Sequence, residues 1–131
     1  MRRQLWPWVT DDESLAFLAE ALTNKHKTAI FLAQNESREI VDFLEASLRS
    51  DYVEDCDTSP VGYIEGWFVG ENYRRQNVGR ELTIAAEDWA RQLGCQEMAS
   101  DCDLNNTTSL AAHLGSGYKK VSRNIHFKKM L

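Results

Sequence analysis

Residues 62–94 read GYIEGWFVGENYRRQNVGRELTIAAEDWARQLG, and this stretch decides the fold. Residues 62–69 alternate with the two-residue period of a β-strand. From position 78 onward, apolar residues recur at the spacing of an amphipathic helix, and Gly94 stands where a helix C-terminal cap is expected. The polar loop 71–77 therefore joins a strand to a helix whose first backbone N–H groups are free, which makes it a place for phosphate.

Composition limits the kind of protein and partner. The chain has 131 residues and a net charge of −5, which fits one domain that spans 1–131. This mild acidity argues against nucleic acid as the main partner and permits a cationic one. Three cysteines without C-x-x-C spacing predict reduced thiols in a cytoplasmic protein and no zinc site. No membrane partner is expected, because no apolar run reaches membrane-spanning length and the start lacks a signal-peptide pattern.

The segment before the central stretch is predicted to begin with one helix and one strand. Asp11 or Asp12 is expected to cap a helix that runs to about Leu22, because apolar residues then repeat on one face. Residues 28–33 form a short apolar run that is typical of a buried strand.

Residues 38–48 fit two structures. Some of their apolar residues recur at helical spacing, whereas others alternate as in a strand, and the two patterns are equally good. The turn signal at 35–37 favours a hairpin with the preceding strand. Residues 51–57 follow as a loop rich in aspartate and glutamate, which Pro60 closes.

The segment after the central stretch completes a mixed sheet. Residues 96–100 are predicted to be a second strand, parallel to the first because a helix joins the two in a right-handed crossover. A short helix is expected from Thr107 or Thr108 to His113, and residues 118–130 are expected to form one bent strand or two. The predicted fold class is α/β, a mixed sheet with a parallel pair in its middle and an antiparallel remainder, flanked by helices.

The two parallel strands indicate where a ligand would bind. In open α/β sheets, ligands lie beyond the carboxyl ends of parallel strands, where neighbouring strands part. That place is bordered by Val69 on one strand and Asp101 on the other, and the loop 74–79 faces it. The phosphate loop, Glu65 and Asp101 are therefore expected to converge in one cleft.

Two motifs resemble a known superfamily. The loop RRQNVG at 74–79 resembles the R/Q-x-x-G-x-G/A loop of the GCN5-related N-acetyltransferase (GNAT) superfamily, in which backbone N–H groups and the helix dipole hold a pyrophosphate. Asn77 replaces the first glycine, and asparagine is the non-glycine residue most at ease in left-handed conformations. Residues 106–118 resemble the superfamily's N-x-x-A…Y…G-F segment, with His113 where the family usually has tyrosine.

Five short segments, spread over essentially the whole chain, resemble the aminoglycoside 6′-N-acetyltransferase branch of that superfamily. They are RQLWP at 3–7, SDYV at 50–53, EGWFV at 65–69, EMASD at 97–101 and NTTS at 106–109. EMASD and SDYV are specific to that branch. Because RQLWP normally follows a first strand and the opening of the first helix, the resemblance also implies that this chain lacks the usual first strand.

The resemblance implies a GNAT acyl-CoA N-acyltransferase fold and a defined reaction. The enzyme would transfer the acetyl group of acetyl-CoA to the 6′-amine of aminoglycoside antibiotics by direct attack of the amine on the thioester, conferring resistance. Acetyl-CoA would be the cosubstrate, and no metal is needed because positioning and electrostatics suffice. The resemblance further implies a homodimer, since family members are often dimers whose C-terminal strands are exchanged or paired between subunits.

Two residues are candidates for the chemistry. Glu65 would hold the ammonium group of the acceptor and accept its proton, directly or through a water. The alternative for Glu65 is a strand glutamate that faces solvent. His113 would protonate the departing thiolate or donate a hydrogen bond to it. The alternative for His113 is a packing residue.

Coenzyme A is expected to bind along the strand end and the loop that follows. The superfamily pairs pantetheine with the strand backbone, which fits Phe68 and Val69, while the loop would hold the pyrophosphate. The expected cofactor-binding residues are Phe68, Val69, Arg74, Arg75, Gln76, Asn77, Val78, Gly79, Arg80 and Asn106.

The acceptor is expected to meet carboxylates and aromatic rings. Asp101 would bind an amine of the substrate; its alternative is to close a strand-to-helix turn or to cap the next helix. Tyr52 and the acidic loop would complete an anionic wall beside Glu65, because aminoglycosides carry several ammonium groups. Trp6 would stack on a sugar ring.

Two other functions stay open from the sequence. An acidic cleft suits a polyamine equally well, so the chain could acetylate another amine, either a polyamine or a protein. A non-catalytic acetyl-CoA-binding module is the alternative from a different class. Turnover with different amines separates these three functions.

Overall fold

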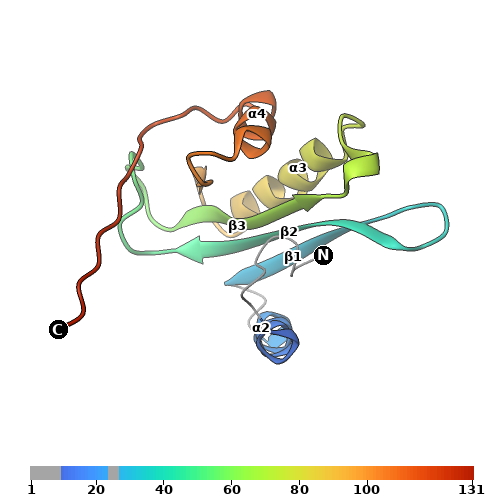
Figure 1. Cartoon of the computed structure of the whole chain (residues 1–131), viewed down its shortest axis with the longest axis horizontal. Helices are drawn as coiled ribbons and strands as arrows, with labels where there is room; N and C mark the ends of the chain where they lie inside the picture. The colour runs from blue at the N-terminus through green and yellow to red at the C-terminus, as the bar shows by residue number, and fades with distance from the viewer. Residues whose placement is uncertain (1–9, 24–26) are drawn as a thin grey trace.

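The computed structural model describes residues 10–23 and 27–131, and within these ranges the chain forms one four-stranded sheet with helices packed on it (Figure 1). In their order across the sheet, the strands are β1 (Thr28–Gln34), β2 (Ile40–Arg49), β3 (Val61–Val69) and β4 (Met98–Ser100). β2 is antiparallel to both β1 and β3, whereas β3 and β4 are parallel. The predicted mixed sheet with a parallel pair is confirmed. The prediction that this pair lies in the middle is wrong for the described sheet, where it lies at one edge because no further strand follows β4.

Helix α2 (Asp11–Thr23) begins with a capping box. Thr10 Oγ1 accepts a hydrogen bond from the backbone N–H of Glu13 at 3.2 Å, and Glu13 Oε2 accepts one from the backbone N–H of Thr10 at 2.8 Å. The prediction that Asp11 or Asp12 caps this helix is therefore wrong, because the Thr-x-x-Glu pair satisfies two N–H groups at once. Both aspartates lie in the first helical turn, where negative charge complements the helix dipole.

Residues 40–48 of the ambiguous segment belong to strand β2, and residues 38 and 39 to the turn before it, so the predicted hairpin is confirmed. Asn35 Oδ1 accepts a hydrogen bond from the backbone N–H of Glu39 at 2.9 Å, and Arg38 takes a left-handed conformation with φ of 63°. This turn joins β1 and β2 in antiparallel register. The strand is favoured over a helix because pairing on both sides places its centre inside the sheet, where Leu44 is fully buried.

Helix α3 (Val78–Gln92) and helix α4 (Thr107–Gly115) lie on one side of the sheet, and α2 lies on the other (Figure 1). Gly94 has φ of 89° and follows the end of α3, as the sequence predicts. Within the ranges 10–23 and 27–131, no helix has the length and apolar character needed to cross a bilayer. The main core joins the sheet to α3 through Leu44, Ala46, Ile64, Leu82 and Ala86.

A β-bulge at Glu65 changes the face on which the later residues of β3 lie. Ile64 pairs with Ala46 of β2, and Gly66 pairs with the adjacent Glu45. Glu65 therefore has no partner in the register and is the extra residue of the bulge. Tyr63 consequently packs in a cluster with Val53 and Val61, whereas Trp67 packs with Ile64 against α3. Uninterrupted alternation over residues 62–69, as the sequence predicts, would place Trp67 on the same face as Tyr63 and Glu65. That expectation is wrong, because the bulge interrupts the alternation.

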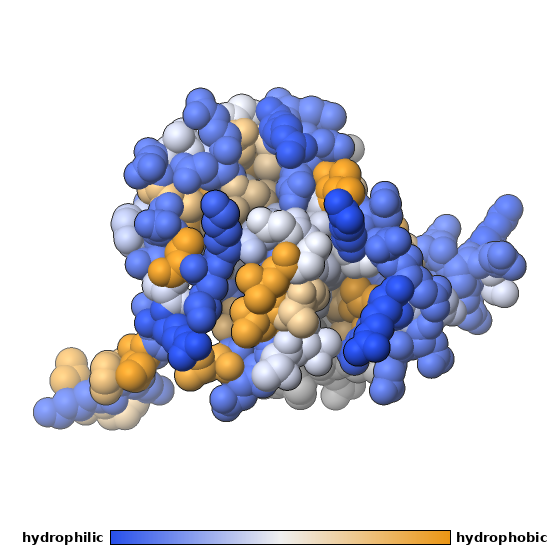
Figure 2. Space-filling view, turned by 90° about the horizontal axis from the view of Figure 1, so that it is seen from above, coloured by the Kyte–Doolittle hydropathy of each residue, from blue (hydrophilic) through white to orange (hydrophobic). Residues whose placement is uncertain are grey.

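The predicted strand over 118–130 is not formed. Tyr118 is anchored to α3 by a hydrogen bond from its hydroxyl to Glu87 Oε1 at 3.0 Å. The C-terminal arm, residues 119–131, then runs away from the body of the molecule without pairing to the sheet (Figure 1). Its apolar side chains are exposed, Ile125 at 81% and Phe127 at 91% (Figure 2). A segment with alternating apolar residues forms a strand only when it can pair with a neighbouring strand. No strand of the described chain pairs with the arm.

Candidate active site

The parallel strands β3 and β4 part after Ile64 and Ser100, their last pair in register. Beyond this fork lies a cleft of about 240 Å³, which is the place where open α/β sheets bind ligands. Residues from β3, the end of β4, the loop after it and α4 form its walls. They are Ile64, Glu65, Gly66, Trp67, Ser100, Asp101, Cys102, Asp103, Asn106, Ser109 and His113.

The walls of the cleft are acidic. Glu65, Asp101 and Asp103 contribute three carboxylates, and none of the wall residues in the described chain is lysine or arginine. A concave surface with charges of one sign attracts counter-ions, so this cleft favours a ligand with several positive charges. Glu65 and Asp101 thus meet as predicted from the strand ends. The loop 74–79, also expected here, contributes no wall residue.

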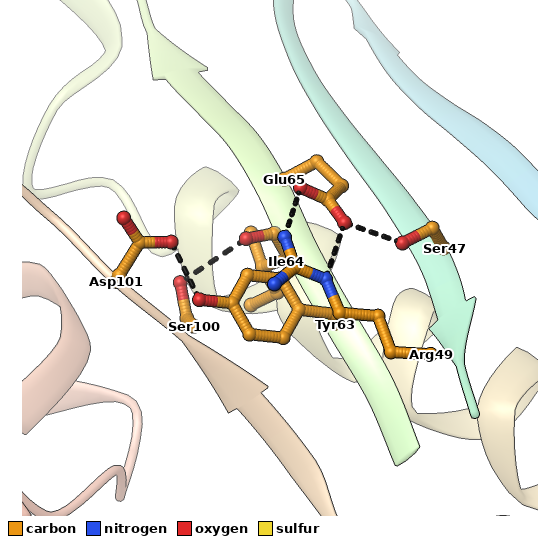
Figure 3. Close-up of polar contacts among 7 residues, drawn as sticks. All are labelled: Ser47, Arg49, Tyr63, Ile64, Glu65, Ser100 and Asp101. Carbon is orange, nitrogen blue, oxygen red and sulfur yellow. Dashed lines mark hydrogen bonds and ion pairs between the residues drawn. The ribbon is translucent and has the colours of Figure 1, made fainter. Parts of the chain in front are cut away.

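Glu65 is held by two side chains of the neighbouring strand β2 (Figure 3). Arg49 binds its carboxylate with two hydrogen bonds, from Nε to Oε1 at 2.9 Å and from Nη2 to Oε2 at 2.7 Å. The hydroxyl of Ser47 also donates to Oε1, at 2.6 Å. The carboxylate therefore does not simply face solvent. Its hydrogen bonds raise the pKa of the Arg49 guanidinium above its usual range, so Arg49 is a permanent cation.

Asp101 is held by Tyr63, whose hydroxyl donates a hydrogen bond to Asp101 Oδ1 at 2.6 Å (Figure 3). Burial and the adjacent Asp101 carboxylate raise the pKa of Tyr63, so this hydroxyl keeps its proton and remains a donor. The guanidinium of Arg49 lies 3.4 Å from the centre of the Tyr63 ring. Arg49 and Tyr63 thus connect Glu65 to Asp101. The alternative in which Asp101 caps the next helix is excluded, because Asn106 caps α4.

His113 lies between the rings of Trp67 and Tyr118, with both contacts edge-on. Its Nδ1 is 2.7 Å from the carbonyl oxygen of Ser109, and its Nε2 is 2.7 Å from Ser100 Oγ. A carbonyl oxygen accepts only, so Nδ1 carries the proton in the neutral ring. Nε2 is then the acceptor, and the Ser100 hydroxyl donates to it. His113 therefore reaches the strand fork through Ser100, besides its packing contacts.

The loop before α3 has the backbone conformation expected of an anion-binding turn. Asn77 has φ of 64°, so asparagine does adopt the left-handed conformation that the sequence requires of it, and Arg75 has φ of 62°. The first helical hydrogen bond runs from the Glu81 N–H to the Asn77 carbonyl oxygen at 2.9 Å. The three N–H groups between these residues precede that bond, and the Asn77 side chain does not cap them. They are available for a phosphate.

Gly79 lets this helix start lie close to β3. A Cβ atom at position 79 would come within 2.9 Å of the Trp67 ring and 3.2 Å of Val69 Cγ2. Real Cβ atoms do not approach that closely, so glycine is required here by packing. The loop is tied to the same strand end by Arg74, whose Nε donates to the Val69 carbonyl oxygen at 3.1 Å.

The other residues predicted to bind the cofactor have local roles in the structure. Gln76 Nε2 donates to the Asn72 carbonyl oxygen at 2.9 Å, and Val78 packs against the main core. Arg80 is exposed on the first turn of α3. Phe68 stacks on Phe43 of β2 with ring centres 5.9 Å apart, and the Asn106 side chain accepts a hydrogen bond from the Ser109 N–H at 3.0 Å as the cap of α4.

One residue predicted to bind the acceptor, Tyr52, is not among the described cleft residues. Tyr52 is 81% exposed, and its hydroxyl lies 3.4 Å from Glu54 Oε2. Trp6 lies outside the described residues. The acidic loop itself is fixed by Glu97, whose Oε1 accepts hydrogen bonds from the backbone N–H groups of Asp57 and Thr58 at 2.9 and 2.7 Å. The hydrogen bond that the Thr58 hydroxyl donates to Oε1, together with these backbone bonds, lowers the pKa of the Glu97 carboxylate.

Reasoning from the sequence missed Arg49, Ser100 and Glu97. The register of the β2–β3 hairpin brings Arg49 to Glu65, and the bulge sets that register. Ser100 and Glu97 stand within the EMASD segment, so their position beside Asp101 was the available signal. Each acts through a partner 13 to 40 positions away, which periodicity does not reveal.

Comparison with known proteins gives consistent matches. Residues 1–118 match the acetyltransferase (GNAT) family. The chain is 41% identical over 133 residues to the aminoglycoside N(6′)-acetyltransferase type 1 of Klebsiella aerogenes, covering 100% of this chain and 87% of that protein. It is 37% identical to the protein of the same name from Serratia marcescens, covering 100% of this chain and 89% of that one.

A solved structure shares this architecture throughout. AAC(6′)-Iy in complex with the bisubstrate analogue CoA-S-monomethyl-acetylneamine superposes with a TM-score of 0.93 at 38% identity, covering 100% of this chain and 88% of that one. The same protein in complex with CoA also gives a TM-score of 0.93, covering 99% of this chain and 84% of that one. The similarity in backbone therefore extends over the whole chain, which includes β3, β4 and the loop before α3.

Proposed function

The chain belongs to the acetyltransferase (GNAT) family, and we propose that it transfers the acetyl group of acetyl-CoA to the 6′-amine of aminoglycoside antibiotics, conferring resistance. The observation that carries this proposal is the acidic cleft at the fork of β3 and β4. Aminoglycosides bear several ammonium groups, which complement three carboxylates. The relatives reported above carry the same activity in their names.

Acetyl-CoA fits the loop before α3. The backbone conformation at Asn77 leaves the first N–H groups of the helix free, and Gly79 lets the helix start approach the strand. Val78, Gly79 and Arg80 would hold the pyrophosphate by their backbone, with Arg74, Arg75 and Gln76 around it. The chain beside Phe68 and Val69 would hold the pantetheine. Acetyl-CoA supplies the acetyl group as a thioester, and the residues of this chain position the acceptor against it.

Glu65 binds the 6′-ammonium group and takes its proton, since an alkylammonium group is mostly charged at neutral pH and cannot attack. Its place at the bulge, beside the strand fork, supports this role. Asp101 binds a second ammonium group, because Tyr63 holds its carboxylate at the cleft wall. The new C–N bond forms as the C–S bond breaks, and the proton that leaves nitrogen is matched by one delivered to sulfur.

His113 and Ser100 supply the proton donor for the sulfur. The Ser100 hydroxyl stands at the fork, and the His113 Nε2 behind it accepts its hydrogen bond. Because Nδ1 is bonded to the Ser109 carbonyl oxygen, the imidazole keeps one orientation. Ser100 thus gives its proton to the leaving thiolate while His113 Nε2 holds the hydroxyl in place. The proton that Glu65 takes from the ammonium group, passed on through water, restores the Ser100 hydroxyl.

We further propose a homodimer formed through the C-terminal arm, in the cytoplasm where acetyl-CoA is available. Val121, Ile125 and Phe127 alternate with polar residues along the arm and are exposed. Such a segment buries its apolar side chains when it pairs with a sheet edge of a second copy. Sedimentation equilibrium should give twice the chain mass for the full chain and a smaller species for a chain truncated after Tyr118. A monomeric full chain would contradict this.

The activity is tested by following free thiol release from acetyl-CoA with a panel of amines. Turnover is expected with kanamycin and tobramycin and is expected to be absent with derivatives that lack the 6′-amine. Turnover with spermidine or peptides alone would contradict the proposal and favour a different amine acetyltransferase. Binding of acetyl-CoA without turnover of any amine would indicate a non-catalytic module.

A further inference from the structure

The carboxylate proposed to bind the substrate is already occupied by a cation of the protein itself. Arg49 grips Glu65 with two hydrogen bonds of 2.9 and 2.7 Å, and Ser47 adds a third contact to the same carboxylate (Figure 3). The guanidinium lies over the Tyr63 ring, 3.4 Å from its centre, and the Tyr63 hydroxyl donates a hydrogen bond to Asp101. One positive charge therefore lies beside both carboxylates to which the ammonium groups of an aminoglycoside are assigned.

The Arg49 guanidinium has well-defined hydrogen bonds to Glu65, but this ion pair contributes little free energy. The Arg49 side chain is 41% exposed and that of Glu65 is 33% exposed. An ion pair at such exposure contributes about 0–1 kcal/mol, because water solvates the separated charges nearly as well. Its contact with Tyr63 adds a comparable amount at an exposed site. An incoming ammonium group can therefore displace the guanidinium from Glu65 without a large loss.

We propose that Arg49 is a specificity-determining residue that acts as an internal substitute for the substrate's ammonium group, yielding Glu65 when the acceptor binds and reclaiming it after acetylation. This inference rests on the proposed function. The acceptor nitrogen is charged when it arrives, but in the product it is an amide and carries no charge. Glu65 then loses its cationic partner in the ligand, and Arg49 is the nearby cation that replaces it.

Two consequences separate this role from a merely structural one. An internal competitor lowers the apparent affinity for the acceptor, because only the fraction of chains with a free Glu65 is ready to bind. It also promotes release of the product, because the returning guanidinium competes with whatever remains bound. Removing the charge should tighten the binding of both acceptor and product, and slower product release should lower kcat while KM also falls.

The test compares two variants. Arg49→Gln keeps a polar side chain but removes the charge, and Arg49→Lys keeps the charge but cannot form the bidentate pair of hydrogen bonds with Glu65. Arg91→Gln serves as the matched control, since Arg91 is 65% exposed on α3 and pairs with Asp88 away from the cleft. Calorimetric titrations use tobramycin and 6′-N-acetyltobramycin as ligands. Arg49→Gln is expected to bind both about three- to fivefold more tightly than the wild type. Arg49→Lys should fall between, and Arg91→Gln should match the wild type.

Unchanged or weaker tobramycin binding in Arg49→Gln overturns the proposal, since a residue that merely supports Glu65 would weaken binding when removed. Tighter binding of tobramycin without tighter binding of its acetylated product overturns the product-release part. Because the titration needs no turnover, its result is independent of the activity. A wild-type chain that binds tobramycin but does not acetylate it contradicts the proposed function, while the Arg49 comparison still stands.

Discussion

The loop proposed to hold the pyrophosphate, residues 70–80, is one continuous segment and uses mainly its backbone, whereas the side proposed to bind the acceptor is made of side chains from β2, β3 and the loop after β4. Asn77 and Gly79 fix the loop through a left-handed turn and a close approach to β3. Glu65 and Asp101 instead take their places through Arg49 and Tyr63. A backbone site is set by local sequence, while a side-chain site depends on how distant strands pair.

This difference suits the two ligands. The pyrophosphate of coenzyme A is the same in every reaction, so a fixed row of N–H groups serves it well. Amine acceptors differ in the number and spacing of their charges, and carboxylates held by exchangeable partners can adapt to them. Substitutions on the two sides should therefore separate cofactor binding from acceptor binding.

The largest effect is expected on the acceptor side. Glu65→Ala should lower kcat/KM for acetyl transfer about 100-fold or more, because it removes both the ammonium partner and the proton acceptor. Its KM for acetyl-CoA should change less than twofold. Steady-state kinetics with tobramycin give both values, and Glu36→Ala, in the exposed β1–β2 turn, is the control. Full activity in Glu65→Ala would show that Glu65 is not in the site.

The corresponding change on the cofactor side is Gly79→Ala. Its new Cβ would press on Trp67 and Val69, so the start of α3 must move away from β3. We expect the KM for acetyl-CoA to rise about tenfold and the free energy of unfolding to fall by about 1–3 kcal/mol. Gly115→Ala is the matched control, because a Cβ there meets nothing within 4 Å. If Gly79→Ala leaves the KM for acetyl-CoA unchanged, the loop does not hold the cofactor as proposed.

A smaller effect is expected at Asp42, where the cofactor loop depends on a distant side chain. Asp42 is fully buried and its Oδ1 accepts a hydrogen bond from the Gly70 N–H, while Oδ2 has no hydrogen-bond partner among residues 10–23 and 27–131. Asp42→Ala should lower the free energy of unfolding by about 1–3 kcal/mol, because it leaves the Gly70 N–H without its acceptor. Asp42→Asn keeps an oxygen that accepts this hydrogen bond, so its free energy of unfolding should fall less than that of Asp42→Ala.

The pH dependence at Asp42 has a definite sign. Burial raises the pKa of the Asp42 carboxyl, so above the ordinary value of about 3.9 the folded chain binds more protons than the unfolded chain. The free energy of unfolding therefore falls as pH rises through the window between the ordinary and the raised pKa. Urea unfolding at pH 4 to 7 should show a shallower fall in Asp42→Asn than in the wild type. Equal slopes would exclude Asp42 as the source.

The same division explains how much the sequence could predict. The strand–loop–helix of 62–94 and the left-handed Asn77 follow from local patterns, and the structure has them. The capping box of Thr10 and Glu13 could also have been predicted from local sequence, but the adjacent aspartates were chosen as the cap instead. The bulge at Glu65 was not readable, because one extra residue leaves the composition of a strand unchanged while it turns every later side chain to the other face.

Long-range partners were the other limit. Arg49 meets Glu65 only through the register of β2 and β3, and Ser100 meets His113 across the turn between β4 and α4. The arm beyond Tyr118 has the alternation of a strand, but whether it forms one depends on a neighbouring strand, and the arm pairs with none in the described part of the chain. In each case the residue type indicated a possible role, but the contact that the residue makes depends on a partner distant in the sequence.

The most direct test of the division into two sides is a pair of calorimetric titrations on the double variant Glu65→Gln, Asp101→Asn, with coenzyme A and with tobramycin. Both substitutions keep the size of the side chain and remove its charge. Coenzyme A should bind within twofold of the wild-type affinity, whereas tobramycin should bind at least about 100-fold more weakly, since each of the two charged contacts contributes about 1.5–3 kcal/mol. Equal losses for both ligands, or tobramycin affinity that is unchanged, would contradict the assignment of these carboxylates to the acceptor.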